Sequence, residues 1–230
     1  MRPVPQRTRY ACQECGTMSP RWLGRCPGCG GYNTMVEEVA DTRSVTTPVG
    51  NSSVQPVRLV DVPADSVTRI GTGVPEVDRV LGGGVVPGAL ILLGGDPGIG
   101  KSTLMLQLAA HVAQDGPVLY VSAEESLAQT RLRMERIVPD APAGVHLLAD
   151  GRLDLLEAAL AASSWRLVVV DSLQTVYDPE AESAPGSVSQ VRQVASRLLR
   201  FAKAQDVPVF LVGHVNKEGS GRPRAVGNAA

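Results

Sequence analysis

A glycine-rich stretch between two apolar runs constrains this chain more than any other feature of its sequence. It follows the spacing G-x-x-x-x-G-K-[ST] and consists of Gly95, Asp96, Pro97, Gly98, Ile99, Gly100, Lys101, Ser102 and Thr103. The run 90–93 before it predicts a buried strand, and 102–114 after it predicts a helix with Leu104, Leu108 and Val112 on one face. Such a loop turns backbone N–H groups toward phosphate oxygens. This context predicts a nucleotide site rather than a chance match.

Acidic residues follow two of the predicted strands. Lys101 is expected to reach the β- and γ-phosphates, and the Ser102 hydroxyl is expected to bind Mg²⁺. Asp171 closes the apolar run 167–170, so it is expected as the second magnesium group. The alternative interpretation is a turn cap, because Ser172 follows it.

Two adjacent glutamates follow the strand predicted near 118–122, at the same edge of the sheet. A carboxylate there can orient or deprotonate an attacking water, and we predict Glu124 for this role, with Glu125 as the alternative. The remaining glutamate is expected to cap the helix that begins at Ser126. Beyond the last strand, His214 and Lys217 are candidates for a sensor of the γ-phosphate or a contact with a neighbouring subunit. An ordinary polar loop is the competing interpretation.

All the cysteines of the chain stand in two C-x-x-C-G units: Cys12, Cys15, Cys26 and Cys29. Four thiolates are the tetrahedral ligand set that Zn²⁺ prefers, so we predict a structural zinc site. Disulfides and an iron–sulfur cluster are the alternatives. Trp22 and Tyr32 are expected to pack against these units, and base stacking is their alternative role.

The rest of the chain alternates strands with helices. Strands are predicted at 90–93, 118–121, 145–148, 167–170 and 207–212, and helices at 127–137, 153–162 and 188–204. This order is typical of an α/β fold with a mostly parallel sheet, which places ligands beyond the carboxyl ends of its strands.

Composition limits the class and location of the protein. The net charge is −1, so global basicity does not point to nucleic acid. No apolar run approaches the length of a membrane span, and Met1 is not followed by the apolar segment of a secretory signal. We therefore predict a cytoplasmic protein without a membrane contact.

The segment 69–88, which runs directly into the glycine-rich stretch, resembles the bacterial RadA family, also called Sms. The segments 120–126, 170–175 and 213–219 support the resemblance, which covers about 10–219. It implies a RecA-like ATPase core behind a zinc module, with ATP and Mg²⁺ as cofactors and Glu124 as the catalytic glutamate. It also implies recombinational DNA repair, single-stranded and branched DNA as partners, branch migration with RecA, and homohexameric rings.

The resemblance divides the chain into four expected parts: a zinc-ribbon module at 1–33, a linker at 34–57, an incomplete ATPase core at 58–219 and a non-homologous tail at 220–230. Because family members continue where this tail stands, we expect a truncated or frame-shifted product and doubt its ring assembly. One alternative function is therefore a remnant that binds ATP and zinc without turnover. Another is a zinc-ribbon interaction module with a regulatory ATPase part.

Overall fold

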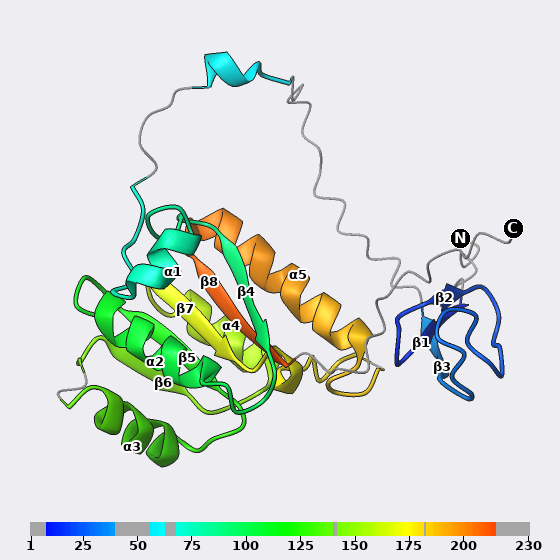
Figure 1. The fold of residues 1–230 in the computed structure, drawn as a ribbon. Helices are drawn as coiled ribbons and strands as arrows, with labels where there is room; N and C mark the ends of the chain where they lie inside the picture. Colours follow the sequence, from blue (N-terminus) through cyan, green and yellow to red (C-terminus); the bar gives the residue numbers. More distant parts are fainter. Residues whose placement is uncertain (1–7, 40–55, 63–67, 140–141, 182, 215–230) are drawn as a thin grey trace, which may run out of the picture.

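The computed structural model describes residues 8–39, 56–62, 68–139, 142–181 and 183–214 of the 230-residue chain. These parts form one small antiparallel sheet and one larger parallel sheet with helices on both faces (Figure 1). The predicted α/β class with a mostly parallel sheet is confirmed. No helix within the described ranges combines the length and the apolar character needed to cross a bilayer.

The small sheet contains β1 (Thr8–Cys12), β2 (Met18–Ser19) and β3 (Met35–Val39), in the order β2-β1-β3. Cys12 pairs in register with Met35, and both side chains are buried in a cluster with Cys26. The module was predicted to end at residue 33, which falls just before β3. The pairing of β3 with β1 extends this small unit to Val39.

The large sheet is parallel throughout and has the order β4-β8-β7-β5-β6. Its strands are β4 (Leu90–Gly95), β5 (Val118–Ser122), β6 (Val145–Leu148), β7 (Leu167–Asp171) and β8 (Val209–His214). The helices are α1 (Pro75–Val80), α2 (Lys101–Val112), α3 (Leu127–Ile137), α4 (Leu153–Ala161) and α5 (Val188–Gln205). Short 3₁₀ turns, η1 (Leu59–Asp61) and η2 (Leu173–Thr175), complete the described elements.

Alternate residues of the central strands face two separate hydrophobic layers. In β7, Val169 packs into a cluster with α2 and α3, whereas Val168 and Val170 pack into a cluster with α4 and α5. All three valines are fully buried. Figure 1 shows the same arrangement, with α2 and α3 on one side of the sheet and α4 and α5 on the other. Burial on both faces explains why these strands are apolar runs rather than alternating patterns.

The last strand begins later than the sequence suggested. It was predicted at 207–212, and β8 spans Val209–His214. Pro208 lacks an N–H group, so it cannot donate a hydrogen bond to a neighbouring strand. Pairing with β4 begins at Val209, whose N–H donates to the Ala89 carbonyl at 2.8 Å. The shift carries the strand forward to His214, at the edge where the predicted site residues stand.

Candidate functional site

The glycine-rich loop leaves the end of β4 and enters α2, as its spacing predicts. Gly98 has φ +81° and Gly100 has φ +94°, in the left-handed region that residues with a Cβ rarely adopt. A Cβ added at either glycine meets no atom within 4 Å. The loop is thus an open cradle at the amino end of a 12-residue helix, where free N–H groups and the helix dipole favour a phosphate.

Lys101 folds back over this loop. Its side chain is 7% exposed, and its Nζ donates to the carbonyl oxygens of Gly95 and Asp96, both at 2.8 Å. The ammonium group therefore stays beside the cradle, in a position to meet phosphate oxygens. Ser102 is the second residue of α2 and lies on the same first turn.

Strand register places the predicted residues along one edge of the sheet. Gly95 of β4 pairs with His214 of β8, and Asp171 of β7 pairs with Ser122 of β5. Because parallel strands end on the same side, the phosphate loop, Asp171 and the turn after β5 share the carboxyl edge. His214 is the last described residue of its strand, and Lys217 lies outside the described residues.

Asp171 has a partner that the sequence analysis missed. The Tyr120 hydroxyl of β5 donates to Asp171 Oδ2 at 2.7 Å. Burial, together with the negative charge of Asp171, raises the pKa of Tyr120 above its usual range, so the phenol keeps its proton and acts as the donor. The 3₁₀ turn that follows has Ser172 at its N-cap position, without a capping hydrogen bond from that side chain. No sequence signal marks Tyr120, because an aromatic residue in an apolar strand is typical of a core.

The two glutamates differ in their contacts. The Ser172 hydroxyl donates to Glu124 Oε1 at 2.7 Å, while the Arg133 guanidinium of α3 pairs with Glu125 Oε1. The expectation that one glutamate caps α3 is wrong. The cap is the Ser126 side chain, which accepts from the Gln129 N–H in a reciprocal capping box. An ion pair thus engages Glu125, while Glu124, which is exposed, accepts a hydrogen bond from a neutral hydroxyl.

The four cysteines come together as a metal centre. Cys12 Sγ lies 3.6 Å from Cys29 Sγ, and Cys15 Sγ lies 3.5 Å from Cys26 Sγ. All four sulfur atoms lie within 4.8 Å of one another. Sulfur atoms at about 2.3 Å from one tetrahedral zinc ion are roughly 3.8 Å apart, so the set fits a single ion. These separations are too long for disulfide bonds, which need about 2.05 Å.

The two C-x-x-C-G units have matching backbone geometry. The Gly16 N–H donates to the Cys12 carbonyl at 2.8 Å, and the Gly30 N–H donates to the Cys26 carbonyl at 2.9 Å. Both glycines have positive φ, which explains the glycine after each pair. The backbone N–H of Cys29 lowers the pKa of the Cys26 thiol to about 6, whereas burial and the three neighbouring thiols raise the pKa of Cys29.

The aromatic residues near this centre do not all pack as expected. Trp22 is 53% exposed and donates its indole N–H to the Met35 carbonyl at 3.2 Å. Tyr32 is 72% exposed, and the Arg25 guanidinium lies 5.5 Å from its ring centroid. Packing against the cysteine units was the wrong expectation for Tyr32. Tyr10 and Leu23 make those contacts instead.

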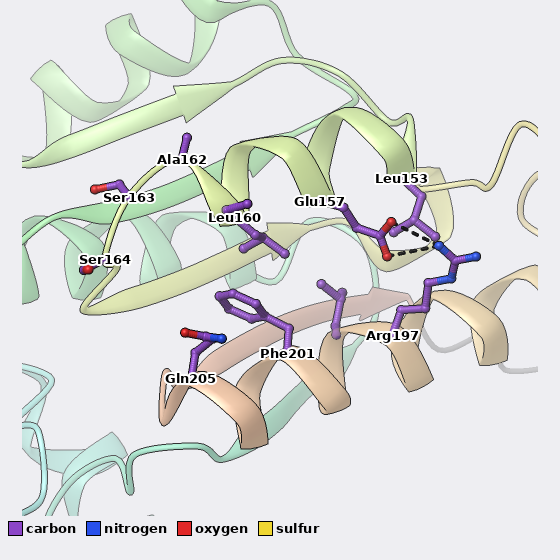
Figure 2. A pocket seen from close by; sticks show the side chains of 11 residues that line it. Leu153, Glu157, Leu160, Ala162, Ser163, Ser164, Arg197, Phe201 and Gln205 are labelled. Carbon is purple, nitrogen blue, oxygen red and sulfur yellow. Dashed lines mark hydrogen bonds and ion pairs between the residues drawn. The ribbon is translucent and has the colours of Figure 1, made fainter. Parts of the chain in front are cut away.

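A cavity of about 650 Å³ lies between α4 and α5. Figure 2 shows Glu157 and Arg197 facing one another at one end, with Ser163 and Gln205 toward the other. Arg197 Nη1 donates to Glu157 at 3.0 Å. The described residues that line this cavity include none of the predicted phosphate or metal residues. This cavity is therefore separate from the predicted nucleotide site at the carboxyl edge of the sheet.

Comparisons with known proteins match both parts of the chain. Residues 54–220 match a family model described as AAA domain, and residues 10–37 match one described as rubredoxin metal binding domain. The chain is 44% identical over 220 residues to DNA repair protein RadA of Bacillus subtilis, covering 93% of this chain and 48% of the relative.

Two further relatives carry the same name. The identity is 45% over 224 residues with the protein of Halalkalibacterium halodurans, covering 94% of this chain and 48% of the relative. It is 42% over 224 residues with that of Listeria monocytogenes, covering 96% and 49%. The chain thus spans about half the length of these relatives. Because the model described as AAA domain matches residues 54–220, more than half of the chain, the chain belongs to the AAA domain family.

Proposed function

We propose that this chain is a DNA-dependent ATPase of recombinational DNA repair. The observation that carries the proposal is the open glycine cradle with the Lys101 ammonium beside it, at the amino end of α2. The relatives' name, DNA repair protein, supports the biological setting.

Each residue of the edge has a proposed role. The N–H groups of 98–103 and the Lys101 ammonium bind the phosphates, and Ser102 and Asp171 hold the magnesium ion. Magnesium supplies charge neutralisation at the β- and γ-phosphates when it is bound. Glu124 accepts the proton of the attacking water, and Ser172 holds its carboxylate through the 2.7 Å hydrogen bond. His214 and Lys217 are proposed as a sensor at the end of β8.

Zinc is the proposed ion of the cysteine centre, where four sulfur ligands leave no position for a substrate. A unit with one small buried cluster depends on such an ion for its stability. We assign this unit a structural role and propose residues 58–219 as the catalytic core.

The proposed partners follow from the family resemblance. They are single-stranded and branched DNA, with RecA as the protein that makes the intermediates on which branch migration acts. Full-length family members are expected to form a homohexameric ring, in which each site is completed by groups from the next subunit, and we do not extend that assembly to this chain.

The test is ATP hydrolysis with Mg²⁺, with and without single-stranded DNA. We expect turnover that rises with DNA and that disappears in Lys101→Ala, while Lys203→Ala, a lysine change on the surface of α5, hydrolyses ATP like the original chain. Nucleotide binding without turnover would instead support the ATP- and zinc-binding remnant. Turnover that persists in Lys101→Ala would overturn the assignment of the site.

A further inference from the structure

Tyr120 is a hydroxyl-bearing residue in an otherwise apolar layer. It is the third residue of β5 and is 2% exposed, inside the cluster that also contains Met105, Met134 and Val169. Phenylalanine fills such a position equally well. A buried hydroxyl without a partner costs free energy, so the position needs a hydrogen-bond acceptor to favour tyrosine over phenylalanine.

That acceptor is Asp171. Strand β5 is next to β7, with Ser122 in register with Asp171, and Tyr120 stands two residues earlier on the same face as Ser122. Its ring leans along the strand and brings the hydroxyl to Asp171 Oδ2 at 2.7 Å. Residues that are 51 positions apart in sequence are thereby joined at the carboxyl edge of the sheet.

A hydrogen bond to one carboxylate oxygen limits the rotation of the whole group. With Oδ2 held by the phenol, Oδ1 is the oxygen left for the metal or for a water bound to it. Partners of this kind orient metal-binding carboxylates in many proteins. We propose that Tyr120 is a positioning residue for magnesium, which holds Asp171 in the orientation that the ion requires. This inference rests on the proposed nucleotide site.

The test uses the full chain loaded with zinc and the variant Tyr120→Phe, which keeps the ring and removes the hydroxyl. Mn²⁺ replaces magnesium as a spectroscopic probe, and its dissociation constant is measured by electron paramagnetic resonance with a non-hydrolysable ATP analogue. Measurements without the analogue give the background. We expect Tyr120→Phe to bind Mn²⁺ about tenfold more weakly. Binding of the analogue without added Mn²⁺ is expected to stay unchanged, because Tyr120 does not belong to the phosphate loop.

Tyr177→Phe is the control, since it removes the hydroxyl of a half-buried tyrosine outside β5 and β7, and it is expected to bind Mn²⁺ like the original chain. Equal Mn²⁺ affinity in Tyr120→Phe and the original chain would overturn the inference. So would a loss of analogue affinity by the same factor without added Mn²⁺, because that result indicates damage to the fold. If the original chain binds no Mn²⁺ with the analogue, the proposed nucleotide site itself fails, and the inference fails with it.

Discussion

Glu124 and Glu125 are neighbours in sequence but have different chemical surroundings. Ser172 donates a hydrogen bond to Glu124, whereas Arg133 pairs with Glu125. We expect Glu124→Gln to bind ATP normally and to lose turnover by about 10²-fold or more, because an amide cannot accept the proton. Glu125→Gln is expected to change turnover by a much smaller factor. Single-turnover hydrolysis and a separate ATP-binding titration measure both effects, and a greater loss in Glu125→Gln would reverse the assignment.

Residues that act within one short motif could be predicted from the sequence, and residues that act across strands could not. The phosphate loop and the cysteine units are local patterns, in which spacing alone brings the groups together. The Tyr120–Asp171 and Ser172–Glu124 hydrogen bonds join positions 51 and 48 residues apart. They depend on the register of β5 and β7, and the composition of those strands does not encode that register.

Helix α5 shows how one element is held to the sheet. Leu198 is 1% exposed and belongs to the hydrophobic cluster in which α4 and α5 pack against the sheet. Its neighbour Leu199 is 42% exposed. Leu198→Ala leaves a cavity in a packed layer, so we expect it to lower the free energy of unfolding by about 2–5 kcal/mol. Leu199→Ala is the matched control and is expected to change it by roughly 0.5 kcal/mol or less. Urea unfolding followed by tryptophan emission tests both, and similar losses would contradict the packing described for α5.

The bounds of regular elements followed local signals closely where those signals were strong. Helix α3 spans Leu127–Ile137 as predicted, because the capping box at Ser126 fixes its start. The bounds of β8 differ from the predicted 207–212 because they depend on pairing with β4, and pairing is not a local property. The extent of the small sheet was missed for the same reason, since β3 is defined by its partner β1.

The molecule contains separate hydrophobic clusters for the small sheet and for the parallel sheet. Metal binding of about 10 kcal/mol stabilises units of this size, so we expect a chelator to unfold the cysteine unit and spare the core. The two tryptophans of the chain report on the two parts, because Trp22 lies near the cysteines and Trp165 is buried in the core.

The measurement uses emission from Trp22→Phe and Trp165→Phe in the presence and absence of chelator. Emission from Trp22 is expected to change as its hydrogen bond to Met35 is lost, while emission from Trp165 stays constant. A parallel change of both signals would show that the two parts unfold together. Metal analysis of the purified chain, expected to give one zinc, distinguishes zinc from iron.

Among the described strands, β4 has a neighbour on one side only, which is β8. Its final residue, Gly95, stands in register with His214. Gly95, where the phosphate loop begins, and His214, where the proposed sensor segment begins, are therefore paired positions on two adjacent strands. Because this pairing is made by the main chain, a side-chain substitution at position 214 removes the proposed sensor group and leaves the register with Gly95 in place.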